Sequence, residues 1–134
     1  MERYKHKYPK PNVEFIGFVD SIDEYYVNAD AVILPIISGS GMKTKTCEAL
    51  MFGKKIFGTK EAFEGYDAIT DYGCVECNTA DEFIHSINTY TDETDHSNKF
   101  NPAVRKYFLE NFEESVVNKR VFTEITTLVN GKNA

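Results

Sequence analysis

The residues best suited to chemistry lie close together in the first half of the chain. Gly39, Ser40 and Gly41 come directly before a segment with helical spacing, and Lys43 and Lys45 fall in its predicted first turn. Glycine allows close approach to the backbone, and the free N–H groups at a helix start attract an anion. Lysines at this position oppose the helix dipole unless an anion offsets their charge. The segment therefore indicates a binding site for a phosphate-bearing ligand.

Two familiar phosphate-binding motifs do not fit this segment. The P-loop pattern G-x-x-x-x-G-K-[ST] fails because Ser40 alone separates the glycines and Met42 intervenes before Lys43. The dinucleotide pattern G-x-G-x-x-G fails because Thr44 occupies its third glycine position. A plainer interpretation stays open, in which the loop is an ordinary turn and both lysines are solvated.

The composition is typical of one globular domain with a modest core. The chain has 134 residues, of which 42% are hydrophobic, and a net charge of −6. This acidic balance argues against nucleic acid as the main partner, because phosphate contacts need clustered Lys and Arg. The basic cluster within residues 3–10 is interpreted as a solvated chain start.

No segment has the character of a membrane span or an export signal. No apolar run approaches the roughly 18 residues that a bilayer span requires, and the N-terminus lacks an apolar signal-peptide core. We therefore expect no transmembrane segment and a cytoplasmic location. The three cysteines agree with this, because an odd and sparse set is not a disulfide framework.

Cys74 and Cys77 form a C-x-x-C pair in what reads as a short strand after a turn. A zinc site needs a second ligand pair, and a redox site needs the pair at a helix N-terminus. We predict that both thiols are buried and take no part in chemistry.

Strand and helix patterns alternate through residues 1–78. Short apolar runs predict strands at 13–19, 31–36, 55–59 and 74–77. Continuous apolar strands separated by helices indicate a partial doubly wound, Rossmann-like α/β domain, with a parallel sheet covered on both faces. The glycine loop then follows the strand at 31–36, at the sheet edge where such folds bind ligands.

Two helices are expected between these strands. The first covers 21–29, where Ser21 and Glu24 form a capping-box pattern. The second covers 41–53 and places Cys47, Leu50 and Met51 on one face before a terminating glycine.

Residues 79–134 are predicted to be a helical C-terminal part of the same single domain. Thr79 and Glu82 form a capping box for the first helix, and Asn101 with Pro102 starts the second. A polar linker at 91–100 is expected to be an exposed loop. A third helix at 113–131 carries an apolar stripe, which consists of Val117, Val121, Ile125, Leu128 and Val129.

About residues 12–67 resemble the C-terminal, donor-binding domain of retaining GT-B glycosyltransferases of the glycosyltransferase family 4 type. The resemblance rests on residue types in order and at matching spacings. They are Gly17, Asp30, Pro35, Gly39, Gly41, Lys43, Lys45, Glu48, Ala49, Gly53, Thr59, Glu64 and Gly65. It implies a nucleoside diphosphate sugar as donor, glycosyl transfer with retention, an acceptor that the sequence does not identify, and no metal or other cofactor.

The resemblance also assigns roles to single residues. Glu48 would accept hydrogen bonds from the ribose hydroxyls, a role for which an acceptor-only carboxylate is suited. The turn from Gly39 through Ser40 and Gly41 to Met42 would face the diphosphate and the sugar. Lys43 and Lys45 would be the catalytic groups that neutralise the departing nucleoside diphosphate. Glu48 as a plain exposed helix residue is the alternative interpretation.

Two departures from the family pattern qualify these roles. The family often has a second glutamate eight positions before the first, in contact with the donor sugar, and Ser40 stands there. A subgroup with G-x-G-x-x-x-K also lacks that acid. The family's donor domain normally starts with two further strands and follows an acceptor domain. We therefore expect the chain to be a fragment or a split-gene product.

The sequence does not decide which partner the chain has. The strands at 13–19 and 31–36 would have open edges. These two strands could pair directly with each other, a second copy of the chain could pair with them, or a separate subunit could supply the missing N-terminal half. A non-catalytic subunit that acts through its helices is the alternative function. A receiver-like or flavodoxin-like binding domain is disfavoured, because a receiver needs an acidic cluster ahead of its first helix and the segment LPIISGSG contains no acid.

Overall fold

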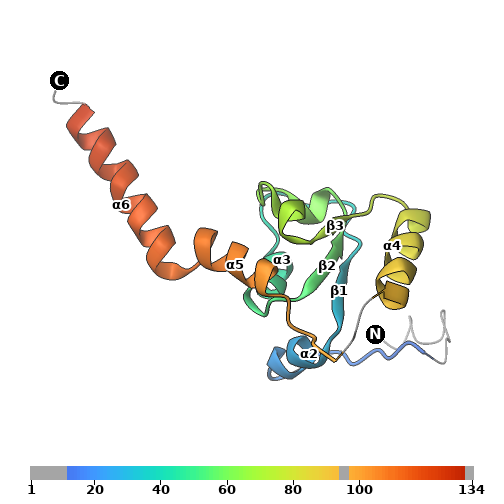
Figure 1. Ribbon diagram of the computed structural model, residues 1–134. Coiled ribbons are helices and arrows are strands. Elements are labelled where there is room, and N and C mark those ends of the chain that lie inside the picture. Colours follow the sequence, from blue (N-terminus) through green and yellow to red (C-terminus); the bar gives the residue numbers. More distant parts are fainter. Residues whose placement is uncertain (1–11, 94–96, 132–134) are drawn as a thin grey trace.

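The centre of the fold is a three-stranded parallel sheet (Figure 1). The structure is a computed structural model and describes residues 12–93 and 97–131. The strands are β1 (Ala31–Leu34), β2 (Lys55–Gly58) and β3 (Val75–Glu76), and they lie side by side in chain order. They correspond to three of the four predicted strands, which confirms the α/β class.

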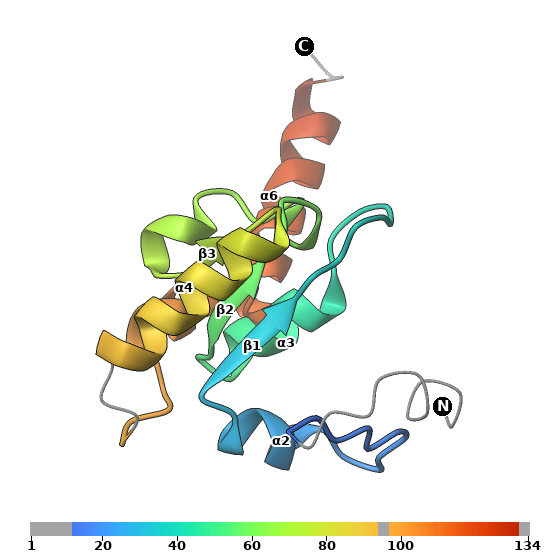
Figure 2. The ribbon, with the colours of Figure 1, turned by 90° about the vertical axis from the view of Figure 1, so that its right-hand side faces the viewer.

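Helices cover both faces of this sheet (Figures 1 and 2). On one face α3 (Thr44–Met51) packs against α5 (Pro102–Asn111), and on the other face α4 (Ala80–Glu93) packs against β2. Between β2 and β3 the chain makes two short 3₁₀ turns, η1 (Glu61–Phe63) and η2 (Ile69–Tyr72). All described strands follow one another in a single direction across the sheet, so the reversal that defines a doubly wound sheet stays a prediction.

The strand predicted at 13–19 is not formed. These residues are irregular, Gly17 has a φ of +92°, and the Phe18 side chain is 91% exposed. A strand needs a neighbour for its backbone N–H and C=O groups, and in the described sheet β1 pairs with β2 alone. The apolar run at 13–19 was therefore not sufficient by itself to predict a strand.

The helix α2 (Asp23–Asn28) begins later than its sequence signals suggested. The N-cap is Ile22, and Ser21 Oγ accepts a hydrogen bond from the Asp23 N–H instead of forming the predicted box with Glu24. The capping-box prediction was wrong because the helix begins at Asp23, one residue later than a Ser21 N-cap requires, so the Ser21 hydroxyl meets the Asp23 N–H and not that of Glu24.

The C-terminal end of α2 is held by a lysine from elsewhere in the chain. The Lys54 Nζ donates hydrogen bonds to the carbonyl oxygens of Val27, Ala29 and Lys99 at 3.0, 3.1 and 2.8 Å. Burial lowers the pKa of Lys54. The three carbonyls satisfy its ammonium group, and those of Val27 and Ala29 belong to the C-terminal end of α2, where the helix dipole is negative.

The helix α3 buries a different face from the predicted one. Its buried residues are Thr46, Ala49 and Leu50, whereas Cys47 is half-buried and Met51 is 39% exposed. These three residues lie inward because α3 fits between the sheet, α5 and the loop after β2. Leu50 was thus the one correct member of the predicted face.

The caps predicted for α4 and α5 are confirmed. Thr79 Oγ1 accepts from the Glu82 N–H at 3.2 Å, and Glu82 Oε2 accepts from the Thr79 N–H at 3.1 Å. Asn101 Oδ1 accepts from the N–H groups of Ala103 and Val104. The linker prediction was partly wrong, because α4 continues through 91–93, where the chain still has helical hydrogen-bonding partners.

The last helix, α6 (Glu114–Gly131), projects away from the rest of the described molecule (Figure 1). None of its residues is buried, although its start and length agree with the prediction. No helix in the described parts of the chain is both long and apolar enough to cross a membrane.

Cys74 and Cys77 are buried free thiols, as predicted. Burial raises the pKa of Cys74 to about 12, so this thiol stays protonated at neutral pH.

Candidate functional site

The glycine loop lies where the sequence placed it, between the carboxyl end of β1 and the start of α3. Gly41 has a φ of +70°, in the left-handed region that favours glycine. A Cβ at Gly39 would lie 3.2 Å from the Lys43 Cε, so the lysine side chain packs closely over this glycine. Gly39 also has a positive φ, of +151°, so both positions of the loop favour glycine.

The helix start itself is open. Lys43 is the N-cap residue, and no side chain among the described residues caps the helix there. The Lys43 carbonyl accepts hydrogen bonds from the N–H groups of Thr46 and Cys47. The unbonded backbone N–H groups of the first turn can therefore receive an anion.

Lys43 is surrounded by acceptors. Its Nζ lies 2.6 Å from the Gly41 carbonyl oxygen, 2.8 Å from Glu61 Oε1 and 3.0 Å from Glu64 Oε2. The hydrogen bond to Glu61 raises the pKa of Lys43, partly opposed by desolvation and supported by Glu64. The side chain is 12% exposed.

Lys45 has different surroundings. It is the second residue of α3, its side chain is exposed, and its ammonium group forms no hydrogen bond or ion pair with the described residues, although its backbone carbonyl accepts from the Tyr26 hydroxyl at 3.5 Å. The structure thus separates two lysines that looked equivalent in the sequence.

Glu48 lies one turn further along α3 and is half-buried. Tyr26 on α2 donates a hydrogen bond from its hydroxyl to Glu48 Oε2 at 3.0 Å, and the Tyr26 ring stacks on Phe52 at 5.0 Å. Burial raises the pKa of Tyr26, and Glu48 adds to the shift. The other carboxylate oxygen, Oε1, has no hydrogen-bond partner among the described residues.

Contacts with the loop after β2 hold the glycine loop in place. Thr59 Oγ1 donates to the Ile36 carbonyl, and the Tyr66 hydroxyl donates to the Lys43 carbonyl at 2.8 Å. A Cβ at Gly65 would lie 2.5 Å from the Met42 Cγ. Met42, predicted to face the ligand, packs against this second loop.

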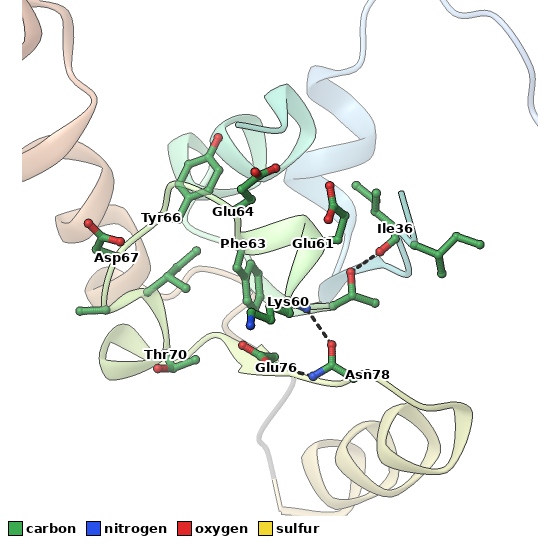
Figure 3. Close-up of a pocket in the computed structure, with 14 residues that line it drawn as sticks. Ile36, Lys60, Glu61, Phe63, Glu64, Tyr66, Asp67, Thr70, Glu76 and Asn78 are labelled. Atoms are coloured by element: carbon green, nitrogen blue, oxygen red, sulfur yellow. Dashed lines mark hydrogen bonds between the residues drawn. The ribbon is translucent and has the colours of Figure 1, made fainter. Parts of the chain in front are cut away.

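A cavity of about 680 Å³ opens beside these loops, at the carboxyl ends of the strands (Figure 3). Its acidic lining residues include Glu61, Glu64, Asp67 and Glu76. Glu61 and Glu64 also contact Lys43, so the cavity and the start of α3 share a wall. No sequence pattern marked Glu61 as functional. The usable signal was the spacing of Glu61 and Glu64, which are three positions apart, as on one side of a helical turn, and directly before Gly65.

The predicted site residues thus fall into three groups. Gly39, Gly41 and Lys43 form one connected unit. Ser40 and Lys45 are exposed beside it, and Glu48 lies one turn away with Tyr26. Within the described residues, no group of three or more His, Cys, Asp and Glu side chains is arranged to hold a metal ion.

Comparison with known proteins identifies a family. The sequence model of the family described as "Glycosyl transferases group 1" matches residues 1–92, which include β1 through most of α4. No curated protein and no solved structure gives a significant match.

Proposed function

The chain belongs to the group 1 glycosyl transferases, and on that premise we propose that it binds a nucleoside diphosphate sugar at the start of α3. In this proposal the sugar nucleotide is the donor for glycosyl transfer with retention, on a GT-B donor domain. The observation that carries the proposal is the uncapped helix start, preceded by Gly39 and Gly41 at the carboxyl end of β1.

The diphosphate would lie against the backbone N–H groups of the first turn. The exposed Lys45 ammonium would supply positive charge beside them. As the glycosyl bond breaks, negative charge grows on the leaving diphosphate, and donors already in place stabilise it without reorganising. A metal ion is not needed for this electrostatic role.

Glu48 would bind the ribose. Its Oε1 is open to a hydroxyl donor, while Oε2 is held by Tyr26 at 3.0 Å. Because Tyr26 fixes the side chain, Glu48 would lose little conformational entropy when the ribose binds. This arrangement supports the role that the resemblance assigns to Glu48.

A second candidate function is a non-catalytic subunit that binds a partner polypeptide. The observation in its favour is α6, where Phe122 is 73% exposed and Leu128 is 64% exposed. Exposed apolar helix faces are typical of protein contacts.

Calorimetric titration of the chain with UDP and with GDP tests the first proposal. We expect weak binding of at least one of them, with equal affinity in the presence and absence of EDTA. Binding that disappears in EDTA would contradict the metal-independent mechanism. Absence of binding of either nucleotide would favour the non-catalytic subunit.

A further inference from the structure

We propose that Glu61 and Glu64 are positioning residues, which fix Lys43 as a bracket between the glycine loop and the loop after β2. In consequence Lys45, and not Lys43, supplies the free positive charge of the site. The part that concerns the anion rests on the proposed function. The bracket itself does not.

The Lys43 ammonium group has all of its hydrogen-bonding capacity in use. An ammonium group has three N–H donors, and it has no acceptor. Three oxygen atoms lie within 3.0 Å of the Lys43 Nζ, one each from Gly41, Glu61 and Glu64. No donor remains for a phosphate oxygen while these three contacts persist.

The net charge around Lys43 also disfavours an anion there. One lysine faces two carboxylates, so the group formed by Lys43, Glu61 and Glu64 carries a net negative charge. Such a group does not attract an anion. The Lys45 ammonium group forms no ion pair or hydrogen bond with the described residues, so all of its N–H donors are available to an anion.

Lys43 and its neighbours hold the glycine loop and the start of α3 against the loop after β2. The Lys43 ammonium binds the Gly41 carbonyl, and the Lys43 carbonyl in turn accepts from Tyr66 at 2.8 Å. Thr46 Oγ1 donates to the Ala62 carbonyl at 2.7 Å. These contacts set the direction of the backbone between β1 and α3, and thus of the N–H groups that would meet the anion.

Under this proposal, removal of Glu61 and Glu64 changes the anion affinity in the direction opposite to the one that their charges alone would predict. Removing two negative charges near an anion site raises anion affinity if the charges act only through the field. If Glu61 and Glu64 act through Lys43, their removal loosens the glycine loop and lowers anion affinity.

UDP titration of two double variants decides between these outcomes. The double variant Glu61→Ala with Glu64→Ala is expected to bind UDP at least fivefold more weakly than the unaltered chain. The matched control is Asp67→Ala with Glu76→Ala, which removes two carboxylates from the same cavity but none from Lys43. We expect unchanged or tighter binding for this control.

The lysines are tested in the same way. Lys45→Gln is expected to weaken UDP binding at least fivefold and to reduce its dependence on salt. Lys119→Gln, an exposed lysine on α6, is the control and should bind as the unaltered chain does. Tighter or unchanged binding by the Glu61 and Glu64 variant overturns the proposal.

Hydrogen exchange without nucleotide tests the bracket separately. We expect faster exchange of the backbone amides of residues 39–43 in the Glu61 and Glu64 variant than in the cavity control. The single variant Glu64→Ala, at a half-exposed side chain, should show a smaller increase if the double variant does not fold. Faster exchange in a chain that binds no UDP would retain the bracket and reject the proposed function. Unchanged exchange would reject the bracket.

Discussion

The carboxylate of Glu48 has one oxygen held by a neighbour and one oxygen open. Tyr26 donates to Oε2, and both residues are half-buried, so the side chain is oriented before any ligand arrives. A second glutamate on the surface, Glu110, accepts from the hydroxyl of Tyr72 at 3.3 Å. Both are tyrosine–glutamate hydrogen bonds, but Glu48 lies on α3 at the proposed nucleotide site, whereas Glu110 lies on α5.

The change Glu48→Gln should weaken UDP binding by about 1–3 kcal/mol, because a charged acceptor becomes a neutral one. The melting temperature should change little, since the glutamine carbonyl can still accept from Tyr26. Calorimetry and thermal unfolding measure the two effects, with Glu110→Gln as the control. Early unfolding with unchanged affinity would mean that Glu48 is a structural residue.

Among the elements, α5 and α6 differ sharply in how they contact the rest of the molecule. Val104 and Tyr107 of α5 are buried against α3 and η2. By contrast, α6 is joined to α5 mainly through Arg120, which donates to the carbonyls of Glu110 and Asn111. Most of the stability of helices in proteins comes from tertiary packing, of which α6 has little.

A pair of equal substitutions tests this difference. Val104→Ala should lower the free energy of unfolding by about 2 kcal/mol, from lost burial and the cavity left behind. Val121→Ala should change it by less than about 0.5 kcal/mol, because the site is half-exposed and alanine favours the helix. Urea unfolding gives both values. Equal losses would show that α6 is packed against another surface in solution.

For the molecule as a whole, the feature that bears on its oligomeric state is the edge of the sheet at β1. The described sheet ends there, Ile33 is 51% exposed, and the irregular segment before α2 exposes Phe18. An exposed apolar edge strand favours pairing with another chain.

We therefore predict a dimer or higher oligomer with contacts at 13–19 or 31–36. Sedimentation equilibrium over a wide concentration range measures the state, and Ile33→Lys should shift it toward the monomer. Val121→Lys on α6 is the control and should leave it unchanged. A chain that is monomeric at every concentration contradicts the prediction, and dissociation by the control alone would place the contact on α6.

The sequence by itself determined the features that depend on neighbouring residues. The caps of α4 and α5, three parallel strands and the position of the glycine loop follow from local patterns. Such patterns act through backbone hydrogen bonds and side chains a few residues apart. The same local reasoning failed at 13–19, because a strand depends on a partner strand, and at Ser21, because a cap depends on where the helix begins.

Tertiary structure alone decided how the charges of the site are used. Lys43 and Lys45 are two positions apart and have the same side chain, so no local pattern distinguishes them. Their difference arises from Glu61 and Glu64, which reach Lys43 from 18 and 21 positions away. Folding brings the loop after β2 against the start of α3, and that contact neutralises one lysine and leaves the other exposed to the solvent.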